Sequence, residues 1–209
     1  MTSPPARSDK RDRIIEAAIA VFAEKGFHAA RISDIADRAS VADGTIYLYF
    51  RNKEDVLLSI FEEKMDSLLG ELGNTLRPLT DPREKIRAFA KQHVEQIRRD
   101  PDLAQVFQVE LRQSRKFLRD YRPEKLWAYL DVFGRLVEEG KGAGLFRPDV
   151  DPFVAKWSFF GSLDELSIQW VLSRKRDRFN LEKAAEQVAE VVLRGIATDP
   201  QAPRTRSPS

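Results

Sequence analysis

The sequence predicts an all-α protein. Apolar residues recur every three or four positions along almost the whole chain, which is the spacing of one helix face, and no sustained alternation of period two indicates strands. Hydrophobic residues occupy 42% of the 209 positions, which is enough to fill a core. The Pro- and Ser-rich ends, residues 1–7 and 199–209, are too poor in apolar side chains to order themselves, so we expect disordered tails there.

Composition excludes several classes of function. Without cysteine the chain can form neither a disulfide nor a thiolate metal site, and its two histidines lie far apart in the sequence. We therefore expect no metal centre and no cofactor. The longest apolar run, AAIAVFA at 17–23, is too short to cross a bilayer, and the N-terminus lacks the apolar segment of a signal peptide. We expect a cytoplasmic protein without a membrane partner.

Three helical patterns open the chain. The first begins after Ser8 and ends at Gly26, and the second spans residues 33–39 with Ser33 as its cap. The third is the stretch GTIYLYF, residues 44–50. Their inward residues are Ile14, Ile15, Ala18, Val21 and Phe22 in the first helix and Ile35, Ala36 and Ala39 in the second. Two short helices joined by a tight turn and braced by a third predict a helix-turn-helix that enters a DNA major groove.

The third helix can be short because only the first turns of a reading helix approach the bases. Ile46 and Phe50 lie four apart and anchor it, which leaves Tyr47, Leu48 and Tyr49 facing outward or sideways. Tyrosine hydroxyls can hydrogen-bond to phosphate oxygens. The plainer alternative for Tyr47 is a packed aromatic ring with a solvated hydroxyl.

Other polar positions near this helix have a DNA interpretation and a structural one. Gly44 lets the backbone approach the sugar-phosphate chain, and Thr45 either reaches a phosphate or base edge or is an ordinary first-turn residue. Asp43 either accepts from a cytosine amino group or caps the helix. Lys53 starts the next, long helix, where a bound phosphate would offset its unfavourable position in the helix dipole. Asn52 and the residue three positions later also explain that start as a capping box.

The segment GFHAARISDIADRASVADGTIYLYFRNKEDVL resembles the DNA-binding domain of the TetR family of transcriptional repressors. The resemblance implies a TetR-like fold of about nine helices, with a helix-turn-helix domain at 8–52 and a helical ligand-binding and dimerisation domain at 53–198. It implies phosphate contacts from Ser33, Thr45, Tyr47, Tyr49 and Lys53, and an approach to base edges by Val41, Ala42, Asp43 and Gly44. Ala30 and Arg31 stand where the family often has two threonines, so Arg31 is the expected substitute.

The remaining helical patterns cover residues 53–77, 84–97, 102–114, the stretch after Pro123, 151–172 and 180–196. The stretch after Pro123 carries Leu126, Trp127, Leu130, Phe133 and Val137 inward, and the last helix carries Leu181, Ala185, Val188, Val192 and Ile196. The pattern at 151–173 is apolar nearly all round, so it must be covered on more than one side. We expect a homodimer through 151–173 and 180–197, bound to a palindromic operator.

A small-molecule effector is expected in a tunnel of the C-terminal domain. Its predicted wall consists of Met65, Leu68, Leu69, Leu72, Phe89, Phe107, Leu111, Phe133 and Phe159, although a packed core explains the same pattern. His93 is either part of this wall or a satisfied interior histidine. The segments VELRQS and FFGSLDE resemble those of the fatty-acid-degradation regulators (FadR type) of the family. This resemblance implies release from DNA by long-chain acyl-CoA. Its phosphates would need cations, for which the candidates are Arg112, Arg115 and Lys116.

Three alternatives remain open. A TetR-type repressor can sense another apolar molecule, as multidrug-efflux regulators do. A helical hydrolase can be imagined from Asp164, Glu165, Glu110 and His93, but no nucleophile motif accompanies them, so we expect no enzyme. A helical adaptor that uses the helix-turn-helix to bind protein would show no salt-dependent DNA affinity.

Overall fold

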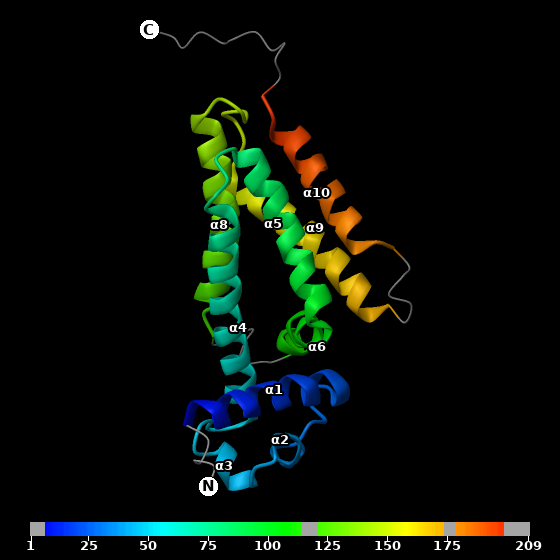
Figure 1. Cartoon of the computed structure of the whole chain (residues 1–209). Coiled ribbons are helices and arrows are strands. Elements are labelled where there is room, and N and C mark those ends of the chain that lie inside the picture. Colours follow the sequence, from blue (N-terminus) through cyan, green and yellow to red (C-terminus); the bar gives the residue numbers. More distant parts are fainter. Residues whose placement is uncertain (1–6, 114–120, 174–178, 199–209) are drawn as a thin grey trace.

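The computed structural model describes residues 7–113, 121–173 and 179–198, and the described residues are almost entirely helical (Figure 1). Within these ranges the sole strand-like feature is an isolated bridge between Phe146 and Ala197. The elements are α1 (Arg7–Lys25), α2 (Ile32–Ala39), α3 (Asp43–Ile46), α4 (Lys53–Leu76), α5 (Pro82–Arg99), α6 (Pro101–Gln105), the π-helix η1 (Val106–Glu110), the 3-10 helix η2 (Leu111–Gln113), α8 (Glu124–Gly142), α9 (Pro152–Leu172) and α10 (Leu181–Ile196). The all-α prediction is confirmed, whereas residue 7, predicted in a tail, belongs to α1.

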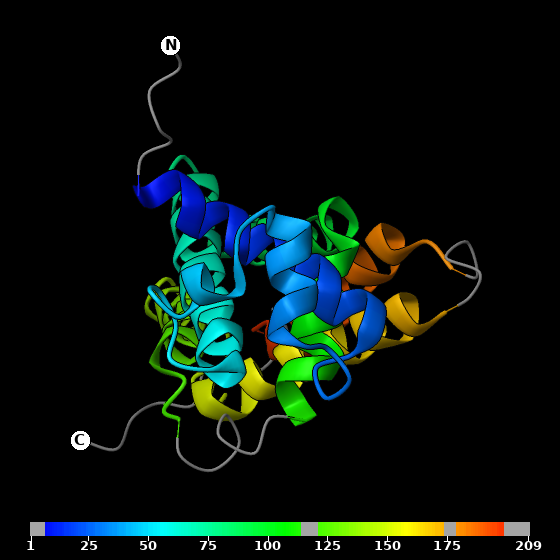
Figure 2. The same ribbon diagram turned by 90° about the horizontal axis from the view of Figure 1, so that it is seen from below.

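Helices α1 to α3 form a small N-terminal unit at one end of the molecule (Figures 1 and 2). All the inward positions predicted for α1 and α2 are buried. Gly26 ends the first helix region with a φ of +77°, a value that suits glycine because it has no Cβ. The amphipathic pattern therefore placed the core of this unit correctly.

The start of α2 differs from the prediction. The helix begins at Ile32, so Ser33 lies in the first turn and does not cap it. Asp34 satisfies the N-terminus, because its Oδ2 accepts the N–H of Arg31 at 2.9 Å while its Oδ1 lies 2.9 Å from the Nζ of Lys25. The hydrogen bond from Lys25 and that from the Arg31 backbone hold the pKa of Asp34 below its ordinary value.

The reading helix is shorter than predicted. The α-helical part, α3, ends at Ile46, and the chain continues as a tight turn in which the N–H groups of Tyr49 and Phe50 both donate to the Ile46 carbonyl. Ala42 occupies the cap position, so Asp43 is the first helical residue and not the cap. Ile46 and Phe50 are buried and anchor the segment as expected.

Helix α4 leads from the N-terminal unit into the C-terminal domain (Figure 1). Asn52 caps it by accepting the Asp55 N–H at 2.9 Å, and Asp55 accepts the Arg51 N–H at 2.9 Å. Its 24 residues span about 36 Å at 1.5 Å per residue. One helix thus reaches from the N-terminal unit into the C-terminal domain.

The C-terminal domain is a bundle in which α5 packs on α10, and α9 packs on both α8 and α10 (Figure 1). Two predicted stripes are partly wrong. Trp127 is 45% exposed because it lies off the face formed by Leu130 and Phe133. In α10, Val188 and Val192 are only half-buried, since Ala189 and Leu193 hold the inner face with Leu181, Ala185 and Ile196.

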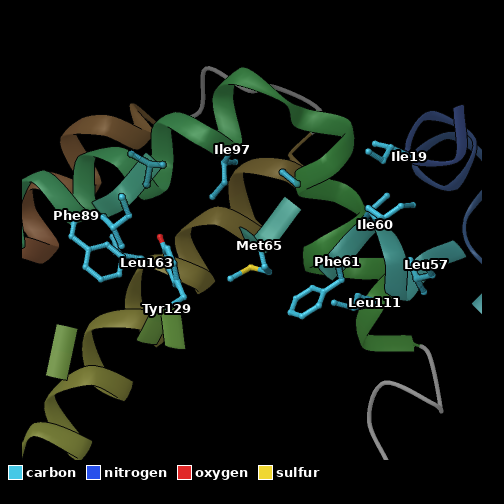
Figure 3. Close-up of a cluster of buried hydrophobic side chains, with 14 of the residues drawn as sticks. Ile19, Leu57, Ile60, Phe61, Met65, Phe89, Ile97, Leu111, Tyr129 and Leu163 are labelled. Carbon is cyan, nitrogen blue, oxygen red and sulfur yellow. The ribbon is translucent and has the colours of Figure 1, made fainter. Parts of the chain in front are cut away.

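One core runs through both parts of the chain. Figure 3 shows Ile19 of α1 beside Ile60 of α4, followed by Phe61, Met65 and Tyr129. These buried side chains belong to one contiguous cluster. Packing therefore joins the N-terminal unit to the C-terminal domain without an intervening polar gap.

Candidate functional site

The outer face of α3 and its following turn is exposed and polar or aromatic. Tyr47 is 57% exposed and Leu48 is 72% exposed, and Gly44 has nothing within 4 Å of an added Cβ. The exposed predicted contact residues are Arg31, Ala42, Asp43, Gly44, Tyr47 and Leu48, and the half-buried ones are Ser33, Val41, Thr45, Tyr49 and Lys53. An exposed leucine in the turn directly after α3 suits the methyl group of thymine in a major groove. The DNA contacts themselves stay predictions.

Lys53 has a structural role that the sequence did not indicate. Its Nζ donates to the carbonyls of His28 at 3.1 Å and Ala30 at 2.8 Å, and it lies 4.8 Å from the centre of the Phe27 ring. Burial lowers the pKa of Lys53. An ammonium group has three hydrogens, so one remains for a phosphate while the other two tie the α1–α2 loop to α4.

Arg51 is a candidate phosphate contact that the sequence reasoning missed. It lies in the turn before α4 and is exposed, and its side chain makes no ion pair or hydrogen bond in the part of the chain that the structure describes. Its position directly after the anchoring Phe50 was the available signal. A free guanidinium beside a reading helix is well suited to bind a phosphate.

A cavity of about 520 Å³ opens in the C-terminal domain between α4, α5, α6, η1, η2, α8 and α9. This volume lies in the range of small-molecule sites. Of the predicted wall residues, six line it, which are Met65, Leu68, His93, Phe107, Leu111 and Arg112. Further lining comes from residues that the prediction omitted, among them Phe61, Ile97, Leu126, Tyr129, Trp157 and Phe160.

The other predicted wall residues do not line this cavity. Phe133 and Phe159 stack with ring centres 4.2 Å apart, and Phe89 meets Phe159 edge-on at 5.5 Å, so these three rings fill the core. Leu72 is buried and Leu69 is half-buried against the core. Two further candidates, Arg115 and Lys116, lie outside the described residues.

Arg112 and Asp164 bring an ion pair to the cavity wall, and the Asp100 carboxylate lines the cavity as well. Arg112 of η2 donates through Nη2 to the Oδ2 of Asp164 at 2.5 Å, and its side chain is 47% exposed. Asp164 is 9% exposed, so this partly buried carboxylate is neutralised by the arginine. The guanidinium leaves further N–H groups at the cavity rim, which suits an anionic part of a ligand.

A second polar pair lies deeper in the wall. His93 of α5 and Tyr129 of α8 meet with 3.0 Å between Nδ1 and the hydroxyl. Burial lowers the pKa of His93 to about 4, and the Asp164 carboxylate raises it by a smaller amount. Burial also raises the pKa of Tyr129, so both groups are neutral at neutral pH.

The groups imagined for a hydrolase do not form one site. Glu110 accepts the N–H of Phe27, and Asp164 is paired with Arg112. Glu165 is exposed and accepts from Gln169 within α9. These carboxylates therefore face three different surroundings instead of converging on His93.

Glu110 joins the cavity wall to the N-terminal unit. It is 5% exposed, and its Oε2 accepts the backbone N–H of Phe27 at 2.7 Å. The residues flanking Glu110 in η1 and η2, Phe107 and Leu111, line the cavity. Sequence reasoning missed this contact, because its two partners are 83 residues apart.

Comparison with known proteins identifies two matching family models. One, described as bacterial regulatory proteins of the tetR family, matches residues 14–60, and the other, described as the C-terminal region of YsiA-like proteins, matches residues 61–195. The chain belongs to the TetR family of bacterial regulators. The predictions of family and fold are confirmed, and the model of the C-terminal region covers most of the domain that contains the cavity.

The relatives also support the FadR-type resemblance. The fatty acid metabolism regulator protein of Bacillus subtilis is 37% identical over 184 residues, which is 88% of this chain and 94% of that protein. The structure of the fatty acid degradation regulator FadR from Bacillus halodurans superimposes with a TM-score of 0.83 at 41% identity, covering 93% of this chain and 98% of that one. FadR from B. subtilis in complex with stearoyl-CoA gives a TM-score of 0.82 at 37% identity, covering 88% and 98%.

Two negative findings concern the described residues alone. None of their helices is both long and apolar enough for a membrane span. Among the same residues no group of three or more His, Asp or Glu side chains is arranged to hold a metal ion.

We predict different effects for two neighbouring cations. Arg51→Ala should lower the salt slope of DNA binding by roughly one and leave the melting temperature unchanged, because only a phosphate contact is lost. Lys53→Ala should lower the slope similarly and also destabilise the fold by about 1–2 kcal/mol, because two loop carbonyls lose a charged donor. DNA titrations at several salt concentrations and thermal unfolding measure both effects, and identical behaviour of the two variants would contradict the structural role of Lys53.

We predict that stability depends on pH through His93. Its pKa is lowered on folding, from 6.5 to about 4, so the unfolded chain binds a proton in this window that the folded chain does not. The free energy of unfolding should therefore fall as the pH drops through the window, by up to about 3 kcal/mol. Urea unfolding at a series of pH values measures this loss. His93→Gln should flatten the dependence, whereas His28→Gln, which removes the exposed histidine, should leave it as in the wild type.

Proposed function

We propose that the protein is a homodimeric repressor, acting in the cytoplasm, that binds a palindromic operator and is released by long-chain acyl-CoA. The main observation behind this proposal is the largely apolar cavity of about 520 Å³ with Arg112 at its rim. The fold that contains it is shared with a FadR structure that holds stearoyl-CoA. An acyl chain suits the apolar wall, and the N–H groups that Arg112 does not use for Asp164 suit the phosphates of CoA. The regulated genes are accordingly proposed to serve fatty-acid degradation.

Exposed apolar side chains support dimerisation through α9 and α10. Phe153, Val154, Trp157 and Leu172 of α9 are 42% to 62% exposed, and Val191 of α10 is 71% exposed. Apolar groups gathered on the outer side of a helix pair favour burial against a second copy. A two-fold dimer presents two reading helices, which suits a palindromic DNA site.

The proposed release mechanism uses η1. Glu110 of η1 bonds to the N-terminal unit, while Phe107 of η1 and Leu111 of η2 line the cavity. An acyl chain that displaces Phe107 and Leu111 also moves Glu110, and with it the Phe27 N–H. Displacing one N-terminal unit changes the spacing of the two reading helices in the dimer, so that they no longer match the operator.

The direct test is reciprocal binding. Stearoyl-CoA should weaken binding to DNA from upstream of the protein's own gene by roughly 5- to 150-fold, and the same DNA should weaken stearoyl-CoA binding by the same factor. Fluorescence anisotropy and calorimetry measure the two affinities. The affinity should also rise with chain length, by up to about 0.8 kcal/mol per buried methylene. Equal acyl-CoA affinities with and without DNA, or equal affinities of free CoA and stearoyl-CoA, would refute the proposal.

We predict that Glu110→Ala uncouples the two sites. The variant keeps the cavity wall, so stearoyl-CoA should bind it as well as the wild type, while the coupling factor falls roughly two- to thirtyfold. Both titrations above, repeated on the variant, measure the factor. Glu138→Ala, which removes an exposed carboxylate of α8 paired only with Lys141 in the described residues, is the matched control. Undiminished coupling in Glu110→Ala would show that η1 transmits nothing through this bond.

A further inference from the structure

The His93–Tyr129 pair is a polar point within an otherwise aromatic part of the cavity wall. Both residues line the cavity. The Phe89 ring meets Tyr129 edge-on at 4.9 Å, and the Phe160 ring meets His93 edge-on at 5.9 Å. A hydrogen-bonding pair between aromatic rings at a ligand cavity is typical of a group that fixes the orientation of a ligand.

Counting hydrogens shows that the pair has an unused donor. A neutral imidazole and a phenol carry one hydrogen each on nitrogen or oxygen, and their mutual hydrogen bond uses one of the two. The other hydrogen is on Nε2 of His93 or on the Tyr129 hydroxyl. Nε2 is buried and has no hydrogen-bond partner among the residues that the structure describes. Unpaired buried polar atoms are rare in native proteins and indicate a missing partner.

The position of the pair indicates which ligand atom can meet it. Phe160, which contacts His93, lies one turn before Asp164 on α9, and Asp164 binds Arg112 at the cavity rim. The pair is therefore close to the charged end of the cavity, where a CoA thioester passes from its polar part into its acyl chain. The thioester carbonyl oxygen is an acceptor at that junction.

We propose that the His93–Tyr129 pair donates a hydrogen bond to the thioester carbonyl oxygen of the effector and so selects acyl-CoA over CoA derivatives without this carbonyl. The inference rests on the proposed function, because it requires the acyl-CoA to occupy this cavity. This hydrogen bond gives a specificity that an apolar tunnel lacks. Apolar contacts alone distinguish ligands by the length of the acyl chain and do not recognise the thioester at its start.

The test compares stearoyl-CoA with S-octadecyl-CoA, a thioether in which a methylene replaces the carbonyl. Calorimetry on the wild-type protein should show the thioester binding roughly five- to tenfold more tightly, the effect of one additional neutral hydrogen bond. Each residue alone retains a donor, so the informative variant is the double substitution His93→Leu with Tyr129→Phe. In that variant the ratio of the two affinities should fall to about one, while the thioether binds as in the wild type.

Retained thioether binding shows that the double variant is folded and keeps its cavity. His28→Leu, which removes the other histidine from the exposed α1–α2 loop, is the control and should keep the wild-type ratio. A wild-type ratio of one overturns the inference and leaves the proposed function standing. An unchanged ratio in the double variant does the same. If neither CoA derivative binds the wild type, the proposed function fails and the inference fails with it.

A third ligand separates the thioester from an oxygen further along the chain. If 12-hydroxystearoyl-CoA binds the wild type more tightly than stearoyl-CoA, and the double variant loses this preference, the pair reads a chain hydroxyl. That result overturns the assignment to the thioester carbonyl. Equal or weaker binding of the hydroxylated ligand, together with the thioether result, supports the assignment.

Discussion

The hydrogen bond between Glu110 and the Phe27 N–H is the polar contact by which the cavity wall holds the N-terminal unit, in addition to the apolar core that the two parts share. It is short, at 2.7 Å, and buried, and it joins the cavity wall to the loop that follows α1. Gly26, whose φ of +77° suits glycine, lies directly beside this contact, since the position of an added Cβ is 3.6 Å from the Glu110 carboxylate. A carboxylate buried in this way is held by its partner, since an unpaired one would be costly. The loop therefore cannot move independently of η1.

A second element holds the same loop from α4. Lys53 donates to the carbonyls of residues 28 and 30, so the loop is fixed on one side by η1 and on the other by the start of the long helix. A displacement of η1 relative to α4 must then deform the loop or rotate the whole N-terminal unit. Rotation is the easier response, because the buried residues of α1 to α3 form a closely packed core that resists internal change. Under the proposed release mechanism, this arrangement would convert a small shift of the cavity wall into a rigid-body movement of the N-terminal unit.

The sequence predicted those parts of the structure that depend on local periodicity. The faces of α1 and α2 carry apolar stripes, and their inward residues are buried as predicted. The sequence did not predict which apolar residues fill the core and which line the cavity. Phe89, Phe133 and Phe159 lie at inward helix positions just as Phe107 and Leu111 do, so periodicity alone cannot separate the two sets. It also missed Glu110 with Phe27 and His93 with Tyr129, whose partners meet only in the tertiary structure. Trp127 was predicted to face inward but is exposed, because it lies one position away from the buried face of its helix.

The irregular backbone from residue 101 to residue 113 explains why the cavity lies where it does. The sequence predicted one helix over 102–114, whereas the structure has a short α-helix, a π-helical segment and a 3-10 turn there. Single π-helical turns are frequent at functional sites. The regular helices α4, α5, α8 and α9 form the other sides of the cavity, and this irregular segment forms the side next to the N-terminal unit. A ligand shifts a conformational equilibrium only by binding one state better than another. Under the proposed release mechanism, a ligand would therefore act through the wall that carries Glu110, because that wall is bonded to the N-terminal unit.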